Sequence, residues 1–381
     1  MRFTDFDFSP DLQAGIADRG HITPTPIQER VMAAALDGRD ILGNAQTGSG
    51  KTAAYVLPLL DRIAQCDDLH TVVVVPTREL AYQVEEEITS YARYMDVRTV
   101  VIVGGASMTA QIRQLQDGVQ VVIGTPGRLL DLIRRRKLYL DGVQAFVLDE
   151  VDRMLDLGFL PDVQQLVSYL PARCQSLFFS ATMPDSIRPL ANRLLHDPVQ
   201  ASVDPPAMTV ATVTQAVYMI PDGNKIPTLM RLLRDPGAER VLVFVRTKRD
   251  VDDLHRSLRA RSMNTVALHG DLALPDRLRA LDQFKTGETP ILVATDVAAR
   301  GLDIPDVSHV INYDAPQTVE DYVHRIGRTA RAQKSGAAVS LIAVQDLPMM
   351  KSIERSLKVR MDWQWATSTT TAPAATAARP A

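Results

Sequence analysis

The string AQTGSGKT at residues 45 to 52 constrains the fold of this chain more than any other feature. The residues before it, 40 to 42, are typical of a short strand, and those from Thr52 to Ile63 are typical of a helix. A strand, a glycine-rich turn and a helix N-terminus together form an anion site, because backbone N–H groups and the helix dipole both favour negative charge. The string therefore predicts a phosphate-binding loop on a strand–turn–helix unit.

Within this loop, Lys51 is expected to reach the outer phosphates of a nucleotide and Thr52 to bind Mg²⁺. The strict pattern begins with Gly, and this chain has Ala45 there, while the other fixed positions match. The alternative is a glycine-rich turn with a surface lysine. The residues expected to contact the nucleotide phosphates are Ala45, Gln46, Thr47, Gly48, Ser49, Gly50, Lys51 and Thr52.

A second string, VLDEVD at residues 147 to 152, is an apolar strand that ends in carboxylates. Phosphoryl transfer needs a lysine and a metal that neutralise charge and a carboxylate that positions the nucleophile. Asp149 is placed to hold Mg²⁺, and Glu150 is placed to orient or deprotonate the attacking water. An acidic pair after a strand is alternatively a helix N-cap. The two strings, in this order and about a hundred residues apart, favour a nucleoside triphosphatase.

The 381 residues suggest two domains, and a hydrophobic content of 46% allows each its own core. The net charge of −3 gives no global basic field, so any nucleic acid must be bound by locally placed Arg and Lys. Cys66 and Cys174 form no metal or redox motif, which suits a reducing cytoplasm. No apolar stretch resembles a signal peptide or could span a bilayer.

Short apolar strands alternate with helical patterns, such as Arg78–Tyr94, in both halves of the chain, which predicts doubly wound α/β domains. The expected domains are residues 1–202 and 215–365, joined by a linker at 203–214, and the Ala-, Thr- and Pro-rich residues 366–381 are expected to be disordered. The expected strands are Thr71–Val75, Thr99–Val103, Val119–Ile123, Phe146–Leu148, Ser176–Phe179, Arg240–Val245, Thr265–Leu268, Ile291–Ala294, Val307–Asn312 and Ala338–Ala343.

Further short motifs follow in a fixed order, and together with the two strings above they resemble the DEAD-box family of ATP-dependent RNA helicases over residues 3 to 345. This resemblance implies two tandem RecA-like domains and RNA-stimulated ATP hydrolysis that separates short RNA duplexes. It implies ATP and Mg²⁺ as cofactors and, from the compact ends, a bacterial RhlE-like member. The other motifs are PTPIQ (24–28), PTREL (76–80), Gly104-Gly105, TPGR (125–128), SAT (180–182), VFVRT (243–247), ATDVAARGLD (294–303) and HRIGRTAR (324–331).

The resemblance assigns nucleotide contacts outside the loop. Gln28 offers an amide that can pair with the N6 and N7 edge of adenine, and Phe3 upstream would stack on the base. Taken alone, Gln28 is better explained as a helix-surface residue after a turn that begins with proline. Asp303 resembles the residue that hydrogen-bonds the ribose.

Arg325, Arg328 and Arg331 lie three apart and are expected to share one helical face or one tight turn. The residues that match Arg328 and Arg331 reach the γ-phosphate in the family, and an arginine finger is worth roughly 10³ to 10⁵ in rate. Because they belong to the second domain, hydrolysis is expected to require closure of both domains. The alternative is a solvated basic helix face.

RNA is expected on the face opposite the nucleotide, where phosphate contacts make binding sequence-tolerant and salt-sensitive. His324 would link the nucleotide to the RNA site, and Ser180 and Thr182 would contact Asp152 and so couple hydrolysis to strand separation. The RRRK cluster at 134 to 137 is better explained as a solvated surface. The expected RNA contacts are Thr77, Arg78, Gly105, Thr125, Arg128, Arg246, Thr295, Asp296 and Arg300.

The chain departs from the family pattern at Val151, Leu274 and Ala330. The catalytic carboxylates remain, so activity is expected. Two other functions use many of the same residues: a slowly hydrolysing ATP-gated RNA clamp, and a DNA helicase or translocase of the wider superfamily. We expect a monomer that binds RNA; no zinc site, arginine–glycine repeat or long basic tail indicates a particular RNA or protein partner.

Overall fold

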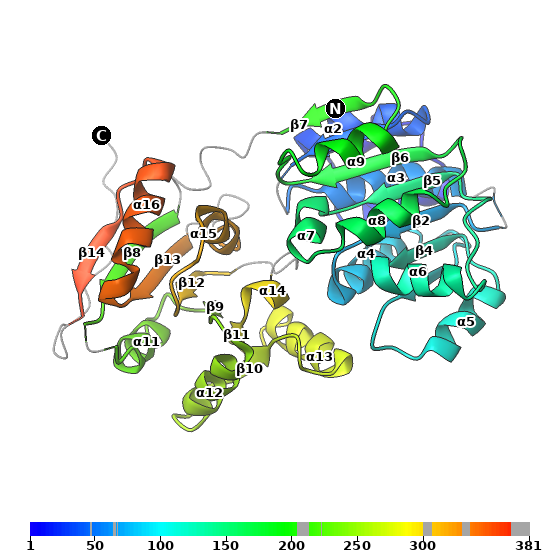
Figure 1. Cartoon of the computed structure of the whole chain (residues 1–381). Helices are drawn as coiled ribbons and strands as arrows, with labels where there is room; N and C mark the ends of the chain where they lie inside the picture. Colours follow the sequence, from blue (N-terminus) through cyan, green and yellow to red (C-terminus); the bar gives the residue numbers. More distant parts are fainter. Residues whose placement is uncertain are drawn as a thin grey trace. The chain divides into compact units, whose positions relative to one another are not determined.

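A computed structural model of the chain describes residues 1–45, 48–63, 66, 68–203, 213–221, 223–299, 307–329 and 336–366. Contacts between these residues divide the molecule into two compact units, the first ending before residue 207 and the second following it. Each unit is an α/β body with its own sheet (Figure 1). No helix in these ranges is both long and apolar enough to cross a membrane.

The first unit contains a seven-stranded sheet in the order β3-β4-β2-β5-β6-β1-β7, and every strand pair in it is parallel. Its strands are β1 (Ile41–Asn44), β2 (Thr71–Val74), β3 (Thr99–Ile102), β4 (Val121–Gly124), β5 (Ala145–Leu148), β6 (Gln175–Ser180) and β7 (Val199–Ser202). Its helices are η1 (Phe3–Asp5), α1 (Pro10–Asp18), α2 (Pro26–Leu36), α3 (Lys51–Ile63), α4 (Arg78–Tyr91), α5 (Met108–Gln116), α6 (Pro126–Arg134), α7 (Val151–Asp156), α8 (Leu160–Val167) and α9 (Arg188–Leu194).

Helices cover both faces of this sheet (Figure 1). Helices α5 to α9 pack on one face, where a core of Val, Leu, Ile and Phe side chains includes Val72, Phe146 and Leu129. Helices α2, α3 and α4 lie on the other face. A parallel sheet that is buried on both sides explains why β2, β4, β5 and β6 consist of fully buried residues.

The second unit repeats the topology of the first, with a parallel seven-stranded sheet in the order β10-β11-β9-β12-β13-β8-β14. Helices α11 and α12 share a core on one face, and α15 and α16 share a core on the other. Its strands are β8 (Val213–Met219), β9 (Val241–Phe244), β10 (Thr265–Leu268), β11 (Ile291–Ala294), β12 (His309–Asn312), β13 (Gly336–Ile342) and β14 (Asp362–Trp365). Its helices are α11 (Ile226–Leu233), α12 (Lys248–Arg259), α13 (Leu274–Lys285), α14 (Asp296–Ala299), α15 (Val319–Ile326), η2 (Val344–Asp346) and α16 (Leu347–Leu357).

The predicted doubly wound fold is confirmed, and each predicted strand overlaps an observed one. Three strands were not predicted, β7, β8 and β14. Each contains exposed or half-buried residues, so it lacks the continuous apolar run that marks a central strand. Strand β8 begins at Val213, so Val213 and Thr214 are strand residues and not part of the linker. Most of the predicted linker and all but the first residue of the predicted tail lie outside the described residues.

Candidate nucleotide site and nucleic-acid edge

The phosphate-binding loop follows β1 and leads into α3, as the sequence predicts. The start of α2 holds it: the Thr25 hydroxyl donates to the Ser49 carbonyl at 2.8 Å, and Gln28 Nε2 donates to the Gly50 carbonyl at 3.1 Å. Gly50 has a φ of +90°, and a Cβ there would lie 2.5 Å from Gln28 Nε2. Only glycine meets both conditions. Gln46 and Thr47 lie outside the described residues.

Lys51 is the first residue of α3, and its side chain is buried with 5% relative exposure. Its ammonium group has no hydrogen-bond partner in the part of the chain that the structure describes. Burying an unpaired charge is costly, so such a group indicates a missing anionic partner. The phosphates of a nucleotide at the N-terminus of α3 fit this requirement.

Asp149 lies at the end of β5 and is completely buried among polar partners. The Tyr55 hydroxyl donates to its Oδ2 at 3.1 Å, and the Glu150 backbone N–H donates to its Oδ1 at 2.9 Å. Burial raises the pKa of Asp149 to about 6, although the nearby positive charge of Lys51 opposes this shift. A divalent cation beside the carboxylate would favour its ionised form. Asp149 therefore fits a metal-binding role.

Glu150 precedes α7 with φ 55° and ψ 52°, a left-handed conformation that is uncommon for a residue with a side chain. Its carboxylate is buried, and Oε2 lies 3.5 Å from Arg153 Nη1. Backbone strain of this kind persists where the surrounding structure enforces it, and it gathers at active sites.

No group of three or more His, Cys, Asp or Glu side chains in the described residues could hold a metal ion by itself. Mg²⁺ in other proteins is usually bound by one or two protein groups together with waters and substrate phosphates. Thr52, the second predicted metal ligand, is the second residue of α3 and is half-buried.

The residues predicted to read the nucleoside are engaged within the protein. The Gln28 side chain is 4% exposed, and its Oε1 accepts from the Thr25 backbone N–H at 2.8 Å. One lone pair and one N–H of the amide remain for a base. The Phe3 ring is also buried and stacks on His21 with 6.3 Å between ring centroids. Asp303 lies outside the described residues.

The structure brings together Asp152, Ser180 and Thr182. Ser180 Oγ accepts from the Asp152 backbone N–H at 3.1 Å and donates to the Thr182 carbonyl at 2.7 Å. The Thr182 backbone N–H and hydroxyl both donate to Asp152 Oδ2, at 2.9 and 3.1 Å. The loop after β6 is therefore tied directly to the helix that follows Glu150.

The residues predicted to contact RNA in the first unit follow β2, β3 and β4, whereas the nucleotide residues follow β1 and β5. All these strands are parallel, so both sets lie along the carboxyl edge of the sheet, in different halves of the strand order. Loops after parallel strands share one edge, so the two sets of residues are separated along that edge, and the expected position of RNA stays a prediction. Asp152, Ser180 and Thr182, which are predicted to couple hydrolysis to strand separation, lie after β5 and β6, in the same half as the predicted nucleotide residues.

The RNA half of this edge is basic and closely packed. Arg78 begins α4 with Thr77 as its N-cap, and its guanidinium lies against Gly105, where any side chain would collide with it. Gly105 also has a φ of +78°. Arg128 Nη1 donates to the Ala106 carbonyl at 3.3 Å. Thr125 precedes α6, which begins with uncapped N–H groups suited to a phosphate.

In the second unit, Arg246 follows β9, and Thr295 and Asp296 follow β11, so they occupy the equivalent half of its carboxyl edge. Arg246 is exposed. Asp296 is bound at both oxygens by Arg325, with Nε–Oδ1 and Nη2–Oδ2 distances of 2.7 Å. Its carboxylate thus has a structural partner already. Arg300 lies outside the described residues.

Arg325 and Arg328 do not share a helical face, because α15 ends at Ile326. They are joined by a turn, in which the Arg328 backbone N–H donates to the Arg325 carbonyl at 3.2 Å. His324 lies in the last turn of α15 and is half-buried. Arg331 and Ala330 lie outside the described residues. Of the other departures, Val151 is fully buried at the start of α7 and Leu274 is 7% exposed at the start of α13.

Three residues have contacts at these sites that the sequence alone did not indicate: Tyr55, Thr25 and Arg325. Tyr55 lies four residues after Lys51 on α3, and this helical spacing puts it on the same face of the helix as Lys51. Thr25 is the second residue of PTPIQ, and its hydroxyl donates to the Ser49 carbonyl of the loop. No local pattern indicated that Arg325 would be buried.

Comparisons with known proteins match both units. Residues 25–190 match the DEAD/DEAH box helicase family, and residues 224–333 match the helicase conserved C-terminal domain. The chain is 43% identical over 363 residues to the DEAD-box ATP-dependent RNA helicase CshA of Bacillus subtilis, covering 95% of this chain and 74% of that protein. It is 40% identical over 361 residues to RhpA of Helicobacter pylori, covering 94% of this chain and 73% of that protein.

The chain is also similar to solved structures over most of its length. S. cerevisiae Dbp5 bound to RNA and ADP BeF3 is 30% identical with a TM-score of 0.83, covering 96% of this chain and 95% of that one. The DEAD-box helicase Mss116 bound to ssRNA and UDP-BeF is 26% identical with a TM-score of 0.86, covering 96% of this chain and 79% of that one.

Proposed function

Since this chain belongs to the DEAD-box family of ATP-dependent RNA helicases, we propose that Lys51, Asp149 and Glu150 form its ATP-hydrolysing centre. The observation that carries this assignment is the buried Lys51 ammonium without a partner in the described residues, beside a buried Asp149. Lys51 binds the outer phosphates, and Glu150 orients the attacking water. Thr52 and Asp149 would hold Mg²⁺, which would neutralise phosphate charge when bound.

We assign the recognition of the nucleotide base to residues near the start of the chain. Gln28 reads the edge of adenine with its remaining lone pair and N–H, and Phe3 contacts the base. Because Gln28 also contacts the Gly50 carbonyl, base binding is transmitted to the phosphate loop. Asp303 binds the ribose. Residues 45 to 50 of the loop make the remaining contacts with the nucleotide phosphates.

The second unit completes the reaction. We assign Arg328 and Arg331 as the cations that stabilise charge developing on the γ-phosphate, which requires the two units to come together during hydrolysis. His324 links ATP hydrolysis to RNA binding. Within the first unit, the contact between Asp152 and Thr182 couples ATP hydrolysis to strand separation.

RNA is bound along the basic halves of the two carboxyl edges, by the residues named above after β2 to β4 and after β9 to β11. These groups suit phosphates and sugars more than base edges, so binding is sequence-tolerant and falls with salt. The motivating observation is that Arg78, Arg128 and Arg246 all follow strands in that half. We further propose that the protein acts as a cytoplasmic monomer, which light scattering after gel filtration would test.

Steady-state phosphate release from ATP tests the proposal, measured without nucleic acid, with single-stranded RNA and with single-stranded DNA. We expect strong stimulation by RNA alone. The Glu150→Gln variant should retain ATP-dependent RNA binding and lose turnover, because it keeps the size of the side chain but cannot accept a proton. Equal stimulation by DNA would favour a translocase. Negligible wild-type turnover with intact ATP-dependent RNA binding would favour a clamp.

A further inference from the structure

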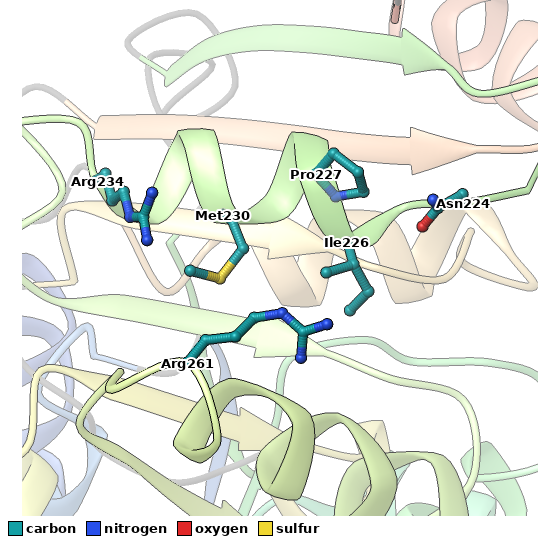
Figure 2. A pocket seen from close by; sticks show the side chains of 6 residues that line it. All are labelled: Asn224, Ile226, Pro227, Met230, Arg234 and Arg261. Carbon is teal, nitrogen blue, oxygen red and sulfur yellow. The ribbon is translucent and has the colours of Figure 1, made fainter. Parts of the chain in front are cut away.

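A hollow of about 500 Å³ opens on the second unit, between α11 and the turn that follows α12. None of its lining residues belongs to the proposed nucleotide or RNA sites. Figure 2 shows Ile226 and Met230 projecting from α11 toward Arg261. We call this hollow the α11 groove. It is lined by Asn224, Ile226, Pro227, Met230, Arg234 and Arg261.

The floor of the α11 groove is apolar and firmly supported. Met230 is 8% exposed and belongs to the core that α11 shares with α12, and Ile226 packs against the same core. Leu229 and Leu233 of α11 belong to the same core. A preformed apolar hollow of this size suits small groups of apolar side chains.

The two arginines of the groove lack acidic partners in the described residues. Arg261 is exposed, and its Nη1 donates to the Ser257 carbonyl and hydroxyl, both at 2.7 Å, which fixes the guanidinium. Arg234 is exposed and makes no side-chain hydrogen bond or ion pair within those ranges. By contrast, Arg256 on α12 pairs with Asp253 at 3.0 Å.

We propose that the α11 groove docks a segment of a partner protein in which apolar side chains lie next to carboxylates. The apolar side chains would cover Ile226 and Met230, while Arg234 and Arg261 would pair with the carboxylates. Arg binds carboxylates at two points, and Arg and Met are enriched at protein interfaces. The chain's own residues 366–381 contain no Asp or Glu, so they do not match this chemistry.

A nucleic acid is disfavoured because the groove floor is apolar and carries no aromatic side chain on which a base could stack. The test uses the full chain and fluorescein-labelled peptides of about 12 residues, roughly three helical turns. One peptide combines Glu with Leu at helical spacing. Its two controls replace every Glu by Gln or every Leu by Ser.

Binding is measured by fluorescence anisotropy, and contact with the floor by the NMR signal of the Met230 methyl group, assigned with Met230→Leu. We expect the Glu/Leu peptide to bind at least about 10-fold more tightly than either control. The double variant Arg234→Glu, Arg261→Glu should lose this preference. Arg355→Glu, an exposed change on α16 at the opposite face of the sheet, should keep it.

RNA-stimulated ATP hydrolysis should be unchanged in the double variant. Three results would overturn the proposal. The first is no binding of the Glu/Leu peptide up to about 1 mM. The second is equal binding by the double variant. The third is a loss of RNA affinity in the double variant together with displacement of the peptide by poly(U), which would identify the groove as an RNA site.

Discussion

Arg325 binds Asp296 through two parallel contacts of 2.7 Å inside the second unit. The same guanidinium donates to Asn312 Oδ1 at 3.1 Å and to the Asp314 carbonyl at 2.7 Å, and it lies over the Phe244 ring at 5.1 Å. The Arg325 side chain is only 2% exposed. One residue therefore joins the loops after β11 and β12 to the helix that precedes Arg328.

Arg325→Lys should destabilise the second unit by about 3 to 5 kcal/mol, because a single ammonium cannot replace the four contacts and leaves buried acceptors unpaired. Both tryptophans, Trp363 and Trp365, lie in the second unit, so urea unfolding followed by tryptophan fluorescence reports on that unit. The exposed Arg279→Lys is the matched control. Equal midpoints for the two variants would contradict this view of Arg325.

Lys51→Ala should lower ATP turnover by roughly 10² to 10³-fold or more, because the charge that neutralises the outer phosphates is removed. Both units should remain folded, since Lys51 makes no hydrogen bond to the described residues that would be lost. Phosphate release and far-UV circular dichroism measure the two effects. The exposed Lys137→Ala serves as the control. Normal turnover in Lys51→Ala would end the assignment of the phosphate loop.

Ser180→Ala combined with Thr182→Val should separate ATP hydrolysis from duplex separation. The change removes the hydroxyls that bind the Asp152 backbone and carboxylate but keeps the Thr182 backbone N–H bond to Asp152. RNA-stimulated phosphate release should stay within a few-fold of wild type, whereas displacement of a labelled strand should be lost. The exposed Ser168→Ala should alter neither. A parallel loss of both activities would show that the contact supports the catalytic centre itself.

Protonation of His70 should lower the stability of the first unit as the pH falls from about 6.5 toward 4, whereas the raised pKa of Asp149 acts in the opposite direction. Burial, assisted by the charge of Arg62, lowers the pKa of His70 to about 4. The folded state therefore keeps His70 neutral, and the resulting stability is complete above pH 6.5 and is lost as His70 takes up a proton. The loss attributable to this group is up to about 3 kcal/mol. In urea unfolding followed by circular dichroism at several pH values, His70→Gln should lose less stability than the wild type between pH 6.5 and 4.

Neither tryptophan belongs to the first unit. Tryptophan fluorescence therefore reports unfolding of the second unit alone, whereas circular dichroism reports both. The unfolding of the first unit is the change in dichroism that occurs without a change in fluorescence. Identical pH dependence in wild type and His70→Gln would show that other groups control acid unfolding.

The sequence by itself determined the features that depend on a few neighbouring residues. A glycine-rich turn between a strand and a helix has one structural solution, so residues 45 to 52 predicted the strand, the loop and α3 together. Apolar runs such as Thr71–Val74 predicted central strands, because only a buried parallel strand hides both of its faces. The order of the motifs was sufficient to indicate the family.

Tertiary structure decided what depends on residues far apart in the chain. Tyr55 meets Asp149 across 94 positions, and Gln175 reaches the carbonyl groups of Ala35 and Arg39. The edge strand β14 forms because β8 offers it a partner, although its own residues are exposed or half-buried. Local propensity cannot anticipate such contacts, since their free energy appears only when two distant segments lie side by side. The burial of Lys51 and Arg325 has the same origin: each helix places its residue at a site that other strands enclose.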